Sequence, residues 1–83
     1  MASKIAYKTS VAGDLRRLDR PVARRIMSKL EQELSRNPSA GIALSGEFRG
    51  LFKYRVGDYR AIYAKTSDGV LILRIAHRKD AYR

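Results

Sequence analysis

The chain contains no cysteine and only one histidine among its 83 residues. Without cysteine there can be no disulfide bonds and no thiolate metal sites, and one histidine cannot build a histidine-ligated zinc centre. We therefore expect the protein to work without a metal ion or another cofactor.

Long apolar runs are also absent from the sequence. No stretch approaches the roughly 20 apolar residues that a membrane-spanning helix needs. The first eight residues lack the apolar run of a signal peptide. The sequence therefore predicts a protein that does not enter a membrane and that acts in the cytoplasm.

The length of the chain predicts one small domain over residues 1–83, with no internal repeat and no low-complexity segment. Hydrophobic residues make up 45% of the sequence, which is enough for one modest core. Because so short a chain has little stability to spare, a bound partner could add to it.

Acidic residues are scarce relative to basic ones. Eight Asp and Glu stand against eighteen Lys and Arg, which gives a net charge of +10. Twelve of the basic residues are arginine, whose planar guanidinium fits phosphate better than the point charge of lysine does. The composition favours a polyanionic partner, first a nucleic acid and second an acidic protein, over an ordinary solvated basic surface.

The first residues of the chain predict a strand followed by a short helix. Polar and apolar residues alternate from Lys4 to Lys8, as in a half-buried strand. A helix is predicted over residues 11–18, with Ser10 as its N-cap.

A long amphipathic helix is predicted next. The stretch Asp19-Arg20-Pro21 is a helix-start signal, and Asn37-Pro38 ends the helix because the residue before proline is disfavoured in helical geometry. Four apolar residues recur every four positions and form the predicted buried stripe: Val22, Ile26, Leu30 and Leu34.

From Leu51 onward the apolar pattern has a period of two, which predicts three antiparallel strands near residues 51–56, 59–66 and 70–78. Gly57-Asp58 fits a type II′ turn, and Asp68-Gly69 fits a type I′ turn. The predicted order is strand, helix, helix, strand, strand, strand (β-α-α-β-β-β). This order indicates an α+β fold in which a helical hairpin lies on a small sheet.

The first of these turns brings like charges together. Across Gly57-Asp58, Arg55 is predicted to face Arg60, and Lys53 shares their face because it lies two residues from Arg55. Directly opposed like charges destabilise a strand pair, and an anion bound between them would explain the arrangement. The alternative is a solvated, mildly repulsive sheet face.

The second turn decides which residues of the last strand join this patch. Continuing the register through Asp68-Gly69 places His77 opposite Arg60. His77 is therefore a candidate site residue, although a histidine at a strand end is more often a plain hydrogen-bonding group. Arg78 falls on the other face unless the strand ends or bulges near Ala76.

Two stretches carry a more specific signal. Residues 51–63 read Leu-Phe-Lys-Tyr-Arg-Val-Gly-Asp-Tyr-Arg-Ala-Ile-Tyr, and residues 74–83 read Arg-Ile-Ala-His-Arg-Lys-Asp-Ala-Tyr-Arg. They resemble the C-terminal half of RelE-type toxins in the RelE/ParE superfamily, and the order of elements extends the resemblance over nearly the whole chain. The resemblance implies the toxin of a type II toxin-antitoxin system, which enters the ribosomal A site and cleaves messenger RNA without a metal ion.

The resemblance also implies which residues act. Lys53 and Arg55 correspond to the basic strand residues of the family. Arg60 and Arg78 correspond to its phosphate-binding arginines, and Tyr82 corresponds to its C-terminal tyrosine. Some relatives use a glutamate and a histidine as base and acid, and no glutamate of this chain occupies a matching strand position. Three further basic residues are candidates for binding RNA: Arg49, Lys79 and Arg83.

Metal-free cleavage requires the 2′-hydroxyl of RNA to attack the adjacent phosphate, so the enzyme must remove one proton, stabilise added negative charge and protonate the leaving oxygen. We expect arginine and lysine to stabilise the charge and Tyr82 to position a base or transfer a proton. Repulsion within the patch favours the loss of a proton from Lys53 or His77, and the sequence leaves open which of the two is the base.

Other functions remain open from the sequence. One is the gyrase-poisoning branch of the same superfamily, which keeps the fold without the RNA-cleaving residues. Another is a non-enzymatic module that only binds nucleic acid, and a third is a toxin fold that has lost its activity. The partners expected for an active toxin are the ribosome with its mRNA and a RelB-like antitoxin, whose acidic, amphipathic segments would form a hetero-oligomer with it.

Overall fold

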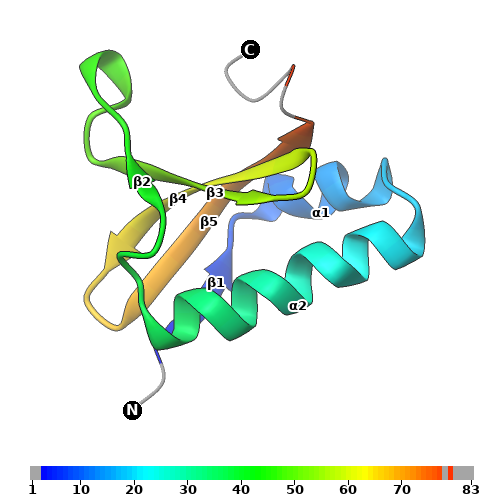
Figure 1. The fold of residues 1–83 in the computed structure, drawn as a ribbon, viewed down its shortest axis with the longest axis horizontal. Helices are drawn as coiled ribbons and strands as arrows, with labels where there is room; N and C mark the ends of the chain where they lie inside the picture. The colour runs from blue at the N-terminus through cyan, green and yellow to red at the C-terminus, as the bar shows by residue number, and fades with distance from the viewer. Residues whose placement is uncertain (1–2, 78, 80–83) are drawn as a thin grey trace.

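A computed structural model describes residues 3–77 and residue 79 of the chain. Its elements in chain order are β1 (Lys4–Tyr7), α1 (Thr9–Arg16), α2 (Arg20–Arg36), β2 (Ile42–Ala43), a 3-10 helix (Gly46–Phe48), β3 (Leu51–Val56), β4 (Tyr59–Thr66) and β5 (Gly69–His77). The predicted α+β class and order of elements are confirmed, while β2 and the 3-10 helix were not predicted. Both α-helices lie on one side of the sheet (Figure 1).

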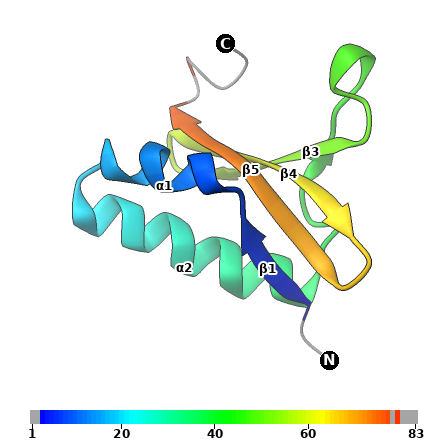
Figure 2. The same cartoon turned by 180° about the vertical axis from the view of Figure 1, so that it is seen from behind.

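The five strands form one sheet in the order β1-β5-β4-β3-β2. The strand β1 runs parallel to β5, and all other neighbouring pairs are antiparallel. Parallel neighbours need a crossover connection, which α1 and α2 supply as they pass over one face of the sheet (Figure 2). The pairing of β1 ends at Tyr7 and Ile72, so β5 continues beyond its parallel neighbour.

The helix α1 begins two residues earlier than predicted. Lys8 is its N-cap residue and makes no side-chain capping bond, so Ser10 lies inside the helix and the prediction of a Ser10 cap is wrong. The reason is the sheet: the Lys8 N–H donates to the Ile72 carbonyl at 2.8 Å, which holds Lys8 extended, and the Val11 N–H already donates to the Lys8 carbonyl at 2.9 Å. Tertiary pairing thus determines where the helix starts.

The helix α2 has the predicted bounds and buried stripe. Asp19 is its extended N-cap with Pro21 in the first turn, and Asn37 is its extended C-cap. Three of the four predicted stripe residues are fully buried, and the fourth, Val22, packs against them at the margin. The four-residue spacing alone therefore identified the face that meets the sheet.

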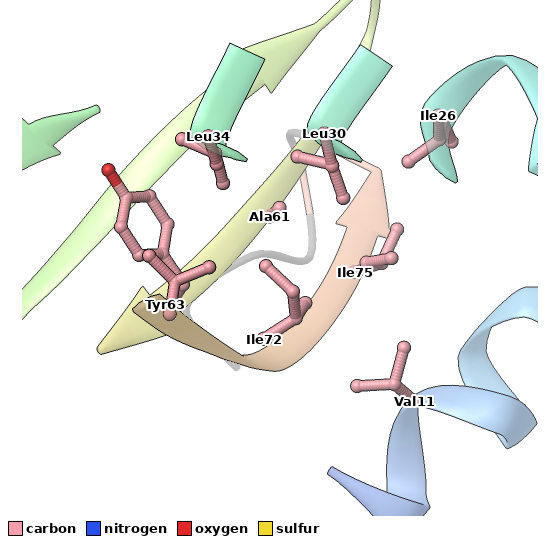
Figure 3. Packing of buried hydrophobic residues seen from close by; sticks show 9 residues of the cluster. Val11, Ile26, Leu30, Leu34, Ala61, Tyr63, Ile72 and Ile75 are labelled. Atoms are coloured by element: carbon pink, nitrogen blue, oxygen red, sulfur yellow. The ribbon is translucent and has the colours of Figure 1, made fainter. Parts of the chain in front are cut away.

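The core lies between α2, α1 and the inner face of the central strands. Figure 3 shows side chains from the helices meeting those from β4 and β5. The buried residues of this core are Val11, Ile26, Leu30, Leu34, Ala61, Tyr63, Val70, Ile72 and Ile75. Both α-helices pack against the same face of the sheet, so neither of them covers the opposite face.

The turn between β3 and β4 is as predicted, whereas the turn between β4 and β5 is not. Gly57 has φ of 59° and Asp58 does not have a positive φ, as a type II′ turn requires. The second hairpin closes at the pair Thr66 and Gly69, so its central residues are 67 and 68, both with negative φ. The predicted type I′ turn at Asp68-Gly69 is therefore wrong.

A β-bulge changes the register between β4 and β5. Tyr63 pairs with Ile72, but the next residue back, Ile62, pairs with Arg74, so Leu73 has no partner in β4. The bulge reverses the alternation of faces in the rest of β5. Residues after Leu73 consequently lie on the faces opposite to those that an unbroken strand would give them.

Tyr63 ties the loop after α2 to the sheet. Its hydroxyl donates to the Pro38 carbonyl at 2.8 Å and accepts from the Gly41 N–H at 2.9 Å. A Cβ at position 41 would lie 2.6 Å from the same hydroxyl, so glycine is required for this close approach. Burial raises the pKa of Tyr63, which keeps the hydroxyl protonated and able to donate.

Tyr63→Phe is expected to lower the free energy of unfolding by about 1–3 kcal/mol, because the carbonyl of Pro38 and the N–H of Gly41 both lose a partly buried partner. Chemical denaturation followed by circular dichroism measures the change. An unchanged midpoint would mean that water replaces the hydroxyl at no cost.

Tyr7 provides a matched contrast. Its hydroxyl is buried, and within the described residues it has no hydrogen-bond partner. Burial, with a smaller contribution from Glu31, raises the pKa of Tyr7 from 10.0 to about 12. The folded protein therefore strongly prefers the neutral phenol.

Tyr7→Phe is expected to leave stability at neutral pH unchanged or to raise it, because no hydrogen bond is lost. Since the pKa of Tyr7 is higher in the folded than in the unfolded state, wild-type stability falls as the pH rises from 10 to about 12. The variant lacks this contribution, so its unfolding midpoint should fall less over that range. Equal alkaline losses in both proteins would contradict the expectation.

Candidate nucleic-acid interface

Three of the four basic residues of β3 and β4 share the sheet face opposite the α-helices, whereas Lys65 lies on the other face, where its Nζ sits 4.9 Å from the centre of the Phe52 ring. Arg55 pairs with Arg60, as predicted, and Lys53 pairs with Ile62. The intervening residues of β3 point the other way and pack against the core, which confirms the alternation. The sequence-predicted grouping of Lys53, Arg55 and Arg60 on one face is therefore confirmed. We call this the outer face.

The bulge adds a fourth cation, Arg74, to the outer face. Arg74 pairs with Ile62, which itself pairs with Lys53 on the other side, so the three residues form one row across the sheet. Arg60 lies two residues before Ile62 on β4 and is diagonal to Arg74. Diagonal neighbours lie about 7–8 Å apart at the backbone, within reach of long side chains.

Ile62 forms an apolar floor among these cations. Its side chain faces away from the helices, yet only 7% of its surface is exposed. Lys53, Arg60 and Arg74 are each partly buried beside it. Charges above an apolar floor are less well screened by water, so their attraction for a phosphate is stronger than on an open surface.

The strands β3, β4 and β5 contain no acidic residue. Arg55 and Arg60 face each other directly, where Cβ atoms lie about 4.5–5.5 Å apart. Arg55 donates through its Nε to the Gly57 carbonyl at 3.1 Å, which holds its guanidinium toward the β3–β4 turn. An anion placed between the two arginines would relieve their repulsion.

His77 is not part of the outer face. It pairs with Tyr59, and Arg60 instead pairs with Ala76, so the prediction that His77 faces Arg60 is wrong. The bulge at Leu73 is the reason. The imidazole of His77 meets the ring of Tyr59 edge-on at 5.5 Å, and its Nδ1 accepts from the Lys79 N–H at 3.3 Å. It lines a cleft of about 360 Å³ between α1 and the end of β5.

The remaining predicted residues fall in two groups. Arg49 lies exposed in the connection between the 3-10 helix and β3, and Lys79 lies exposed beyond β5. Arg78, Tyr82 and Arg83 lie outside the described residues, so the structure leaves open which face Arg78 occupies. Glu47 belongs to the 3-10 helix before β3, which agrees with the expectation that no glutamate occupies a matching strand position.

Arg74 was missed by sequence reasoning, although the sequence contains a signal for it. An unbroken alternation from Ile72 would put Arg74 on the helix-covered face opposite Ala61, where an unpaired charge is costly to bury. Ile72 and Ile75 are both buried although they are three residues apart. A charged residue between two core residues at odd spacing is the pattern of a bulge.

The described part of the chain shows no grouping of three acidic or histidine side chains that could hold a metal ion. Within that part, neither helix combines the length and the hydrophobicity that crossing a membrane demands.

Comparison with known proteins identifies the family. Residues 5–82 match the family described as the ParE toxin of the type II toxin-antitoxin system parDE. The chain belongs to this toxin family. The toxin is 33% identical to Toxin RelG of Mycobacterium tuberculosis over 86 residues, which cover 100% of this chain and 99% of RelG. It is 36% identical to Toxin RelE of the same organism over 83 residues, which cover 95% of this chain and 84% of RelE.

The fold of the toxin agrees with these relatives. The crystal structure of the toxin-antitoxin complex RelBE2 from Mycobacterium tuberculosis matches it with a TM-score of 0.86 and 30% identity, over 96% of this chain and 95% of that one. The protein is thus a RelE/ParE-superfamily toxin of a type II toxin-antitoxin system. Since the superfamily includes both RelE-type and ParE-type toxins, its target must be argued from the outer face.

Proposed function

We propose that this toxin is a metal-independent endoribonuclease that cleaves messenger RNA, in the ribosomal A site. The observation that carries the proposal is the outer face, where four cations from three strands surround Ile62 with no acidic residue in those strands. Such a face suits the phosphate backbone of a nucleic acid. Its arginines can stabilise a phosphate that gains charge during cleavage.

The proposed reaction is an internal transfer of the phosphate. The 2′-oxygen attacks the adjacent phosphorus, its proton passes to a base, and the bond from phosphorus to the 5′-oxygen breaks. The leaving 5′-oxygen takes up a proton from an acid. The products are a 2′,3′-cyclic phosphate and a 5′-hydroxyl, so no water and no metal ion enters this step.

Within this proposal Arg60 and Arg55 stabilise the charged phosphate. The place of His77 on the other face favours Lys53 as the base, because a lysine amine, unlike an arginine guanidinium, can accept a proton in its neutral form. Arg78 and Tyr82 keep the roles expected from the family resemblance, as a phosphate ligand and as the residue that positions a base or transfers a proton. Three exposed or terminal cations would grip the flanking RNA: Arg49, Lys79 and Arg83.

The shape of the site supports dependence on the ribosome as part of this proposal. The outer face is a sheet surface, which can attract a flexible RNA strand but offers little to align its 2′-oxygen with the leaving oxygen. A ribosome holds the message in a defined conformation and could provide that alignment. The toxin would then act in the cytoplasm, where translation takes place.

The proposed regulator is a cognate RelB-like antitoxin. The structural relative described above is a toxin-antitoxin complex. A basic face on a chain of net charge +10 fits an antitoxin with acidic, amphipathic segments, which would cover the cations and form a hetero-oligomer.

The test is cleavage of a defined message in a purified translation system, with analysis of the product ends. Cuts at A-site codons with 2′,3′-cyclic phosphate ends support the proposal, whereas 5′-phosphate ends contradict the chemistry. The family match to ParE toxins makes DNA gyrase the second candidate target. Inhibition of gyrase supercoiling without any RNA cleavage would replace the proposed function, and RNA binding without cleavage or gyrase inhibition would indicate a non-catalytic module.

A further inference from the structure

Two hydrogen bonds at the edge of β5 that faces α1 fix the position of the bulge. The Ile72 carbonyl points to this edge and accepts from the Lys8 N–H at 2.8 Å. The Ile75 N–H points to the same edge and donates to Asp14 Oδ2 at 3.1 Å. In a regular strand, groups on one edge belong to residues an even number apart. A separation of three residues therefore requires the extra residue, Leu73.

Asp14 replaces a missing strand at this edge. The pairing of β1 with β5 ends at Ile72, and α1 follows β1 and contacts β5 beyond that point. The Asp14 carboxylate accepts the amide hydrogen that β1 no longer reaches. A hydrogen bond to a charged acceptor is stronger than one between neutral groups. Only the bulged register presents Ile75, rather than Arg74, to this carboxylate.

The consequence appears on the outer face. With the bulge, Arg74 lies opposite Ile62, in the row that begins at Lys53. Without it, Arg74 would lie opposite Ala61, which is 1% exposed in the core. The bond from Asp14 thus favours the register that places Arg74 on the same face of the sheet as the other cations.

We infer that Arg74 binds a phosphate of the RNA substrate and that Asp14 is the residue that positions it, by holding the bulge through Ile75. The inference rests on the proposed function, since it adds a phosphate ligand to the same outer face. Asp14 itself touches no RNA, because its carboxylate lies at the α1 edge of β5 and not on the outer face.

The experiment is the salt dependence of binding to a single-stranded RNA oligonucleotide that is 2′-O-methylated and so cannot be cleaved. Each phosphate neutralised on a single strand contributes about 0.7 to the slope of log affinity against log salt concentration. Arg74→Gln should lower the slope by about that amount, and Arg74→Lys should restore it. Arg24→Gln removes the same charge from an exposed site on α2 and should leave the slope unchanged.

Asp14 is tested by two variants that remove the same charge. The amide oxygen of Asp14→Asn can still accept from the Ile75 N–H, whereas Asp14→Ala cannot. We expect Asp14→Ala to lower the slope toward that of Arg74→Gln and Asp14→Asn to keep the wild-type slope. In an Arg74→Gln background, Asp14→Ala should have no further effect on the slope, an outcome that general loss of stability would not produce.

The outcomes separate the inference from the proposed function. An Arg74→Gln slope equal to that of wild type, or an equal loss in Arg24→Gln, overturns the inference even if the message is cleaved. Additive effects of the Asp14 and Arg74 changes overturn the positioning role. The expected slopes together with an intact message support the phosphate ligand and contradict only the nuclease. Wild-type protein that does not bind RNA contradicts both.

Discussion

Arg60→Ala is expected to slow cleavage of a ribosome-bound message by about 10²–10³-fold, the loss typical when one preorganised donor to a developing oxyanion is removed. Arg60 lies at the centre of the outer face, directly opposite Arg55 and diagonal to Arg74. Its removal takes away a positive charge. That charge stabilises the phosphate most when the 2′-oxygen has become the fifth oxygen bonded to phosphorus and the negative charge is greatest. The loss should therefore appear in the rate of the chemical step under saturating toxin.

The measurement is single-turnover cleavage, followed by primer extension on one defined message. Arg24→Ala is the matched control because it removes the same charge from the exposed surface of α2, and its rate should stay within a few-fold of wild type. Arg60 is partly buried on the central strand of the sheet, so the unfolding midpoint of each variant should be recorded alongside the rate. A folded Arg60→Ala variant that cleaves at the wild-type rate would remove Arg60 from the site.

Gly69→Ala is expected to destabilise the fold by more than about 3 kcal/mol, a large share of the 5–15 kcal/mol that holds a typical small domain folded. Gly69 is buried at the start of β5 and pairs with Lys4 of the parallel strand β1. A Cβ at this position would overlap the backbone of Lys4. The backbone of Lys4 cannot retreat easily, because its N–H donates to the Asp68 carbonyl at 2.8 Å. The added methyl should therefore force β1 away from the sheet.

Urea denaturation followed by circular dichroism measures this effect. Gly13→Ala is the matched control, since the same atom added there meets nothing within 4 Å and the residue lies within α1. Alanine at that helical position should stabilise the protein by roughly 0.5–1 kcal/mol. A Gly69→Ala variant with the wild-type midpoint would show that β1 contributes little to stability.

The close approach of β1 explains why glycine follows Asp68 in the sequence. The dipeptide Asp68-Gly69 reads as a type I′ turn, which would use glycine for its positive φ. In the structure the glycine begins β5 and is needed for the close approach of β1 instead. The same residue type can thus meet a conformational or a steric requirement, and the local sequence does not distinguish the two.

Local pattern was sufficient to predict the bounds and buried face of α2, the three C-terminal strands and the register of the first hairpin. Each of these depends on residues within one element or across one two-residue turn. The pair Arg55 and Arg60, and with it the location of the basic patch, follows from that hairpin alone. The sequence alone therefore predicted which face of β3 and β4 carries these cations.

Tertiary structure decided what joins the patch from β5. The place of β1 beside β5, the start of α1 and the bulge at Leu73 all depend on contacts between residues far apart in the chain, of which the bond from Ile75 to Asp14 is the clearest. Because each strand residue faces opposite to its neighbour, one extra residue exchanges the two faces. That single shift brings Arg74 to the outer face and moves His77 to the opposite face. A prediction made from the residues of one hairpin at a time cannot include this shift.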